Sequence, residues 1–151
     1  MFLGTYEHRL DAKGRISFPA RFREVLSSLG DGRLIVTTNV DPGARCLVAY
    51  PMGEWQVFQN RIGDLPQFDE NVIRLKRLHV AGAAECVLDR QGRIQLPAAL
   101  RDYAGCKEGA VIFAGVGSSL EIWDRVLWEK ERERAKECLP QINETLARLG
   151  L

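Results

Sequence analysis

The sequence predicts an α+β fold made from two copies of one structural unit, and two observations carry this prediction. The first is an internal repeat: residues 10–23 return as residues 88–101, with eight of fourteen positions identical at an offset of 78 residues. The second is the order of segments, because each copy reads as strand, turn, strand, helix, strand, strand, helix. Neither copy is large enough to bury its own sheet comfortably, so we expect the two to pack as one pseudo-symmetric body.

The first copy opens with a strand over residues 5–10 and a returning strand over residues 15–18, whose apolar residues share one face. Between them, Asp11 can accept hydrogen bonds from nearby backbone N–H groups, and Gly14 can take a positive φ at little cost. We therefore expect a short β-hairpin with a basic tip.

Helical and strand-like segments alternate through the rest of the first copy. Apolar spacing, β-branched residues and turn residues predict a helix over 19–29, strands over 33–38 and 46–50, and a helix over 52–62. Asp69 is placed to cap a connecting helix that closes near Gly82.

The second copy repeats the plan. It predicts strands over 84–88, 93–96, 110–114 and 120–123, a helix over 97–104, and a last helix that Asp124 caps and Pro140 interrupts. We accordingly divide the chain into a first unit (residues 1–64), a connecting helix (65–82) and a second unit with a C-terminal helix (83–151).

The charge distribution is local rather than global. A net charge of +1 argues against a protein that coats nucleic acid by bulk charge, yet residues 8–24 hold five cations against two acids. Residues 74–79 add three cations without an acid. A basic face on a near-neutral protein suits a site that binds weakly on its own.

The repeated Asp–x–x–x–Arg motif has a structural interpretation and a functional one. Asp11, Asp89 and Gly92 are interpreted as structural, because the carboxylates can accept the turn amides or pair with arginine. Arg15 alternates with the apolar Ile16, so we expect it to point outward, where a guanidinium can read guanine or bind a phosphate. A solvated charge without a role is the alternative.

Several function classes find no support in the sequence. There is no Ser–His–Asp arrangement, no Gly-rich phosphate loop and no pair of histidines at metal-binding spacing, so we expect no enzyme, no cofactor, no metal site and no small-molecule substrate. His79 is expected on a helix flank. The four cysteines lie 40, 20 and 32 residues apart, which predicts buried, reduced thiols rather than a zinc or redox site. The sequence predicts neither a signal peptide nor a membrane span.

The opening Met1–Gly4, the two Asp–x–x–x–Arg motifs with their following Pro–Ala, and the segment Leu120–Asp124 resemble the MraZ family over essentially the whole chain. The resemblance implies two AbrB-like (SpoVT-AbrB) swapped-hairpin halves in one double-split β-barrel with peripheral helices. It implies a ring-shaped homo-oligomer, located in the cytoplasm on the nucleoid. It also implies sequence-specific binding to short direct repeats upstream of the division and cell-wall gene cluster, usually as a repressor of the protein's own operon.

The DNA-contacting positions that this resemblance implies are those around the two motifs, and we expect the first copy to contribute more because its charge is denser. They are Lys13, Gly14 and Arg15 in the first copy and Arg90, Gln91 and Arg93 in the second. We add Arg9 as an expected DNA contact because it is a cation close to the first motif. One subunit should bind poorly, whereas a ring on repeated DNA sites gains avidity.

Two other interpretations compete with this one. The charged C-terminal helix could make the protein an oligomeric scaffold for protein interactions without specific DNA binding, and a gel shift with promoter DNA distinguishes the two. An antitoxin-like DNA binder is a nearer alternative, but such chains are usually single-copy with a disordered tail.

Overall fold

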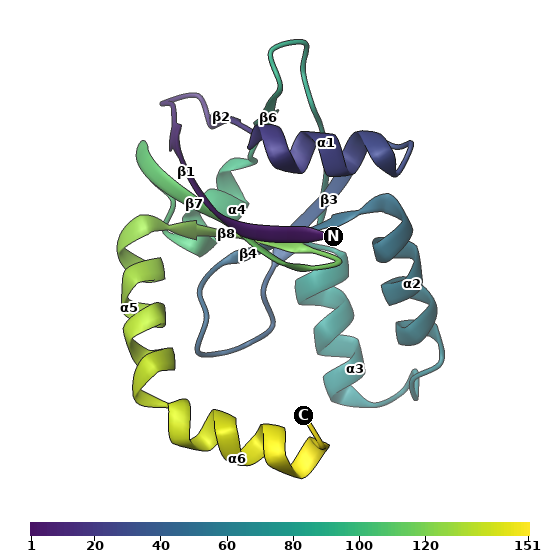
Figure 1. Ribbon diagram of the computed structural model, residues 1–151. Helices are drawn as coiled ribbons and strands as arrows, with labels where there is room; N and C mark the ends of the chain where they lie inside the picture. Colours follow the sequence, from purple (N-terminus) through teal and green to yellow (C-terminus); the bar gives the residue numbers. More distant parts are fainter.

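The computed structural model describes all 151 residues as an α+β fold of eight strands, six α-helices and one short π-helix (Figure 1). Every strand pair is antiparallel, and six strands form one sheet in the order β1-β7-β8-β4-β3-β5. These strands are β1 (Phe2–Leu10), β7 (Gly109–Gly117), β8 (Leu120–Asp124), β4 (Leu47–Pro51), β3 (Arg33–Thr38) and β5 (Ala84–Val87). A separate two-stranded ribbon pairs β2 (Arg15–Ser17) with β6 (Arg93–Gln95).

The expected hairpin within each copy is wrong, because the strands on either side of each turn do not pair with each other. β1 of the first unit pairs with β7 of the second, and β5 of the second pairs with β3 of the first. The returning strands β2 and β6 pair across the units. Each unit therefore completes the sheet of the other, in agreement with the expectation that the two copies pack as one body.

The exchange obeys a pseudo-two-fold axis at the level of single residues. Ile16 pairs with Ile94 at the centre of the ribbon. Tyr6 faces Phe113 across β1 and β7, and the corresponding Ala84 faces Val36 across β5 and β3. The axis also relates β4 and β8, which pair at the middle of the sheet.

One apolar core lies under the sheet and the ribbon and draws on both units. Phe18, Phe22 and Phe113 are fully buried within it, and their rings pack edge to face or tilted at centroid distances of 5.5 and 6.1 Å. Ile16 and Ile94 bring the ribbon onto this core. The inner faces of the two units thus bury each other.

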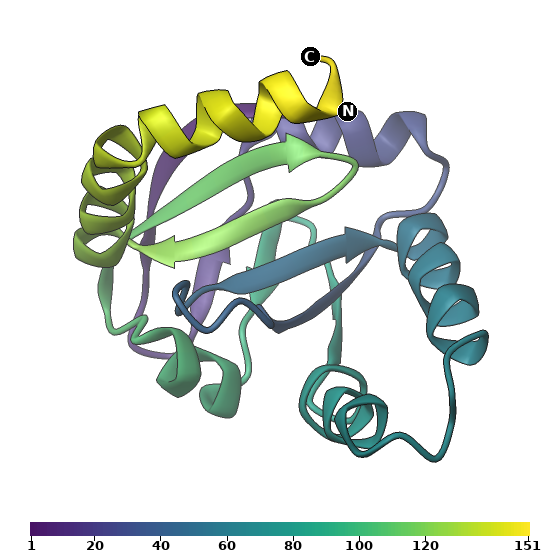
Figure 2. The same ribbon diagram turned by 90° about the horizontal axis from the view of Figure 1, so that it is seen from below.

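The helices are arranged around the strands, with α2 and α5 on opposite sides (Figures 1 and 2). Their bounds are α1 (Ala20–Ser28), α2 (Met52–Gly63), α3 (Glu70–Leu75), α4 (Ala98–Ala104), α5 (Arg125–Glu137) and α6 (Leu139–Leu149). Asp69 and Asp124 cap α3 and α5 as expected, each accepting backbone N–H groups. None of the helices is both long and apolar enough to cross a membrane.

The connecting helix differs from expectation at its end. Residues Lys76–Val80 form the π-helix η1, and His79 is 1% exposed rather than on a flank. Its ring lies among the rings of Tyr50, Trp55 and Phe58, at centroid distances of 4.9 to 6.0 Å. The apolar stripe of α2 and strand β4 therefore bury this histidine, which the sequence pattern of the connecting helix alone did not indicate.

Three of the four cysteines match the expectation of buried free thiols, and Cys138 does not, because it lies exposed at the junction of α5 and α6. Burial raises the pKa of Cys46 and Cys106 to about 12 and that of Cys86 to about 11. Burial therefore favours the protonated form of these three thiols.

Candidate nucleic-acid interface

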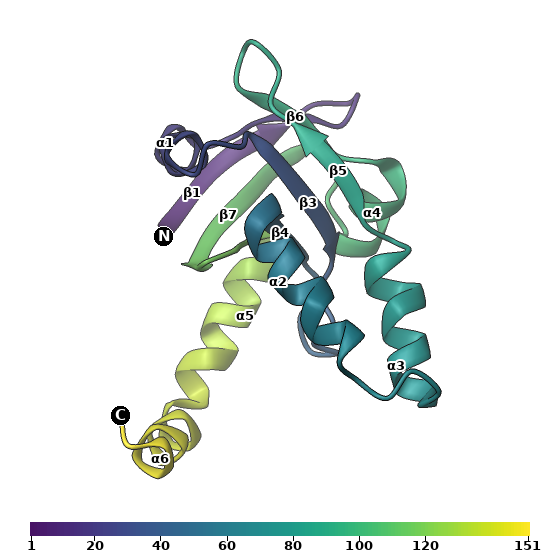
Figure 3. The same ribbon diagram turned by 90° about the vertical axis from the view of Figure 1, so that its right-hand side faces the viewer.

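The two Asp–x–x–x–Arg turns project from the same end of the molecule, on either side of the β2–β6 ribbon (Figures 1 and 3). We call the turn over residues 11–14 the first tip and the turn over residues 89–92 the second tip. Helix α6 and the C-terminus lie at the opposite end (Figure 3). A long ligand can therefore reach both tips at once.

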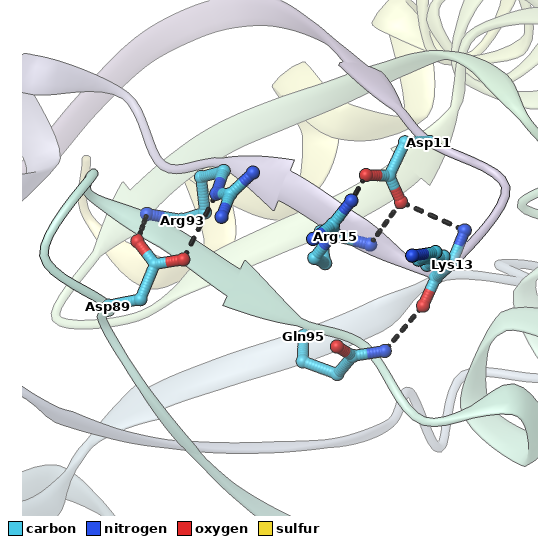
Figure 4. A network of polar contacts seen from close by, with 6 residues as sticks. All are labelled: Asp11, Lys13, Arg15, Asp89, Arg93 and Gln95. Atoms are coloured by element: carbon cyan, nitrogen blue, oxygen red, sulfur yellow. Dashed lines mark hydrogen bonds and ion pairs between the residues drawn. The ribbon is translucent and has the colours of Figure 1, made fainter.

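One carboxylate organises the first tip. Oδ1 of Asp11 accepts the backbone N–H groups of Lys13 and Arg15, both at 2.9 Å, and Oδ2 accepts Nε of Arg15 at 2.9 Å (Figure 4). The backbone N–H groups of Asp11 and Gly14 close the turn on the carbonyls of Arg15 and Asp11. The side chain thus fixes the turn and the arginine together.

The second tip repeats this geometry. Oδ1 of Asp89 accepts the backbone N–H groups of Gln91 and Arg93, both at 2.9 Å. Figure 4 shows the two hydrogen bonds from Arg93, of which the one from Nε to Oδ2 measures 3.0 Å. The pKa of each carboxylate lies below its ordinary value. The main cause is the hydrogen bond from a backbone N–H group, that of Arg15 for Asp11 and that of Arg93 for Asp89. Both carboxylates are therefore ionised at neutral pH.

The two motif arginines, Arg15 and Arg93, are held in place but keep free hydrogen-bond donors. Only Nε of each is bound, and the terminal nitrogens Nη1 and Nη2 have no partner within the chain. The side chains of Arg15 and Arg93 are 37% and 30% exposed. A guanidinium held at Nε with a free fork can form a bidentate hydrogen bond to guanine O6 and N7 or to a phosphate.

Each tip is also bound to the opposite unit. The backbone N–H of Leu96 donates to the carbonyl of Gly14 at 2.8 Å, and that of Phe18 donates to the carbonyl of Gly92 at 2.9 Å. Together with the ribbon, these bonds fix the spacing between the tips. The interface is therefore a rigid pair rather than two independent loops.

The structure adds two residues that the sequence did not identify as part of the site, Arg23 and Arg101. Arg101 lies over the first tip, where a Cβ atom on Gly14 would be 2.8 Å from its Nε, and Arg23 lies over the second, where a Cβ atom on Gly92 would be 2.7 Å from its Nη1. Each arginine is anchored to a carbonyl of its own unit, Arg23 to Phe18 and Arg101 to Leu96. The sequence did contain a signal for these two arginines, because Arg23 and Arg101 form the last identical pair of the repeat.

The other expected contact positions lie around these arginines. Arg9 is exposed near the end of β1, Lys13 is exposed on the first tip, and Arg90 and Gln91 are exposed on the second. Gly14 is buried at φ +81°, so it permits the turn and the close approach of Arg101 instead of offering contact surface. Once Arg23 and Arg101 are included, the first tip has four cations and the second has three, each beside one carboxylate.

No group of three or more histidine, cysteine or acidic side chains is placed to hold a metal ion. None of the five main surface pockets is lined by a residue of either tip. The arrangement presents cationic hydrogen-bond donors on a convex end of the molecule. That chemistry suits a polyanion with an ordered surface.

An α+β body of two strand-exchanging units, with a matched pair of cationic turns at one end, has the form of a DNA-binding transcriptional regulator. The chain belongs to the MraZ family: the family model described as "MraZ protein" matches residues 1–78 and 80–148. The match covers both units and both tips.

Curated relatives agree with this assignment over most or all of their length. The transcriptional regulator MraZ of Desulfitobacterium hafniense (strain DSM 10664 / DCB-2) is 41% identical over 151 residues, which is 100% of either chain. That of Natranaerobius thermophilus is 39% identical over 97% of this chain and 96% of its own. That of Marinomonas sp. (strain MWYL1) is 43% identical over 88% of this chain and 86% of its own. The family is one of transcriptional regulators and not of enzymes.

Proposed function

We propose that this protein binds short direct repeats in its own promoter, at the head of the division and cell-wall gene cluster, and represses transcription there. The observation that carries the proposal is that Arg15 and Arg93 are each fixed at Nε by an aspartate while their terminal nitrogens stay free. Preorganised arginines of this kind suit base recognition, because little side-chain freedom remains to be lost on binding.

The residues divide between two tasks in this proposal. Arg15 and Arg93 read base edges, while Arg9, Lys13, Arg90 and Gln91 contact the backbone on either side, and Arg23 and Arg101 add charge beside each tip. Asp11, Asp89, Gly14 and Gly92 shape the turns. A handful of phosphate contacts gives one subunit only a weak, salt-dependent affinity.

Assembly supplies what a single subunit lacks. We propose that the chain forms a closed homo-oligomeric ring, which presents many pairs of tips to repeated sites in the cytoplasm, on the nucleoid. Residues 1–64 and 83–151 act as the two AbrB-like halves of one double-split barrel, with residues 65–82 as the connection. The strand exchange between the halves supports this description.

The decisive experiment compares Arg15→Ala with Arg61→Ala, an exposed arginine of α2 without a side-chain partner, in a gel shift on promoter DNA. We expect Arg15→Ala to fold and assemble normally and to lose about 1–3 kcal/mol of binding free energy per engaged subunit. Arg61→Ala should bind as the unmodified protein does. Normal affinity of Arg15→Ala would place the site elsewhere.

One observation favours a second candidate, an oligomeric scaffold for other proteins. Helix α6 leaves an apolar face exposed at Leu139, Ile142, Leu146 and Leu149. A scaffold would give no retarded band with promoter DNA, whatever the number of repeats in the probe.

A further inference from the structure

The loop between α2 and α3, which we call the arm loop (residues 64–69), presents an aromatic side chain that nothing in the chain covers. Phe68 in this loop is 97% exposed. The loop is nevertheless held in one shape, because the side-chain amide Nε2 of Gln67 donates to the carbonyl of Ile62 at 3.0 Å and Asp69 caps α3. A side chain on a fixed loop loses little freedom when a partner covers it, so the arm loop is suited to a contact.

A groove that can hold such a side chain lies beside α5, and we call it the α5 groove. It runs between the loop over residues 42–45 and the face of α5 that carries Leu127 and Arg134, and the nearly buried Trp123 also lines it. Nη1 of Arg134 donates to the carbonyl of Gly43 at 3.1 Å, which joins the two walls. The volume of the groove is about 290 Å³. A cavity of about 150 Å³ already holds a benzene ring, so an aromatic side chain fits.

The arm loop and the α5 groove carry opposite charge. Three cations and one acid line the groove, and they are Arg45, Lys130, Arg134 and Glu131. The arm loop contains two acids, Asp64 and Asp69, and no cation. Opposite charge guides two surfaces together, whereas two arm loops or two grooves would repel each other.

We propose that the arm loop of one subunit docks into the α5 groove of a second copy of this chain, with Phe68 as the central anchor. The inference deepens the proposed function, because it rests on the homo-oligomeric ring and names the contact that builds it. Helices α2 and α5 lie on opposite sides of the molecule, so one chain cannot fill its own groove (Figures 1 and 2). A contact between two different surfaces of two copies is heterologous, and contacts of this type close into rings.

This contact leaves the DNA-binding end free. Helices α3 and α5 both extend away from the tips (Figure 3). An aromatic side chain buries only about 150–250 Å² of its own surface, so Phe68 is the energetic centre of a larger contact between the subunits.

Sedimentation of the free protein tests each surface separately. Phe68 and Lys130 are both exposed, so Phe68→Ala and Lys130→Glu should fold as the parent protein does. We expect Phe68→Ala to raise the concentration needed for assembly by roughly thirtyfold or more, as loss of a central aromatic anchor does. Lys130→Glu should also weaken assembly, because it places an acid opposite the acidic arm loop. Leu29→Ala removes another exposed apolar side chain, at the end of α1, and should assemble as the parent does.

A mixture of the two variants tests whether these two surfaces meet each other. Phe68→Ala keeps an intact groove, and Lys130→Glu keeps an intact arm loop. One intact contact can therefore join the two variants, and no further intact contact remains to extend the assembly. We expect the equimolar mixture to form dimers that contain one chain of each kind, which native mass spectrometry identifies by mass.

The outcomes separate this contact from the rest of the proposed function. Assembly of Phe68→Ala at parental concentrations, or a mixture that stays monomeric, overturns the contact and leaves the ring standing. Loss of assembly in Leu149→Ser, with Phe68→Ala unaffected, would assign the contact to α6 instead. A monomeric parent protein overturns the ring and this inference together. In gel shifts, Phe68→Ala should bind a one-repeat probe as the parent does and lose the gain on a multi-repeat probe, whereas absence of a retarded band with the parent protein overturns the DNA-binding function.

Discussion

Among single residues, the aspartates of the tips show how a negative charge can serve the binding of a polyanion. Asp11 lies beside the proposed DNA surface, where its charge alone would repel phosphates. Yet its two oxygens hold three donors, one of which is Nε of Arg15. Asp11 therefore contributes to the free energy of DNA binding in two opposite ways, favourably by positioning Arg15 and unfavourably by its charge. A substitution can show which contribution is larger.

We expect Asp11→Ala to weaken DNA binding several-fold although it makes the protein more positive. Without the carboxylate, the turn loses its acceptor for two backbone N–H groups, and Arg15 regains the side-chain freedom that must be lost again on binding. Titration of promoter DNA by fluorescence anisotropy measures the effect. Glu133→Ala is the matched control, since Glu133 pairs with Lys136 on α5, away from the tips (Figure 3). Tighter binding of Asp11→Ala would show that bulk charge dominates.

The buried ring of His79 makes the stability of the protein depend on pH. Its Nδ1 lies 2.7 Å from the carbonyl of Thr38, which can only accept, so Nδ1 carries the proton of the neutral ring. Nε2 is buried without a partner. Burial is the main cause that lowers the pKa of His79, and the hydrogen bond with the Thr38 carbonyl acts in the other direction. The folded state therefore prefers the neutral ring.

Because the folded pKa lies below the unfolded value, the contribution of His79 to stability is present above about pH 6.5 and is lost as the pH falls below it. We expect the free energy of unfolding in urea to decrease between about pH 7.5 and pH 5.5, by no more than about 1.4 kcal/mol per pH unit for this group. His79→Gln keeps a donor for Thr38 and should flatten the decrease. His8→Gln is the comparison, because His8 is more exposed and its pKa is lowered in the same direction, by burial and by Arg23. An unchanged slope in His79→Gln would contradict this assignment.

At the level of elements, the type of each segment was easier to predict from the sequence than the strand with which it pairs. The strand and helix positions follow from apolar periodicity, and the turns follow from Asp and Gly. The pairing partners of β1 and β2 cannot be predicted in this way, because periodicity indicates which face of a strand is buried and not which strand lies beside it. The same limit hid Arg23 and Arg101, which join the site only through the exchange between units.

The glycines of the turns test how tightly the exchanged elements fit. Gly30 has φ +75° and open space around it, so Gly30→Ala should cost only the left-handed strain, about 1–2 kcal/mol. At Gly14 a Cβ atom would also lie 2.9 Å from the backbone carbonyl of Leu96, which cannot move without disturbing the ribbon. At Gly92 the obstacle is the side chain of Arg23, which can swing away. We expect losses of unfolding free energy in the order Gly14, Gly92, Gly30 in urea titrations, and equal losses would mean that the tips are not tightly packed.

On the scale of the whole molecule, the structure separates the proposed binding end from the end that is free for assembly. The tips lie at one end, while α6 extends from α5 at the other with its apolar residues exposed (Figure 3). With a net charge of only +1, the body between them contributes little attraction to DNA. Under the proposed function, we therefore expect affinity to depend on the number of tips engaged together.

The number of repeats in the DNA should control how tightly the protein binds. A probe with one repeat should bind more weakly than a probe with all repeats by roughly a hundredfold to ten-thousandfold, since later contacts within an assembly are intramolecular. Adding half a helical turn between repeats should remove most of this gain, because it rotates alternate sites away from the ring, whereas a full turn should restore part of it. Raising salt should weaken the multi-repeat probe more steeply, because each engaged subunit adds its own phosphate contacts to the slope. Light scattering of the free protein supplies the control on assembly. A monomer in solution, or equal affinity for one repeat and for many, would contradict the prediction. Two weakly charged tips would then be the whole binding surface, and these are too few to hold an operator.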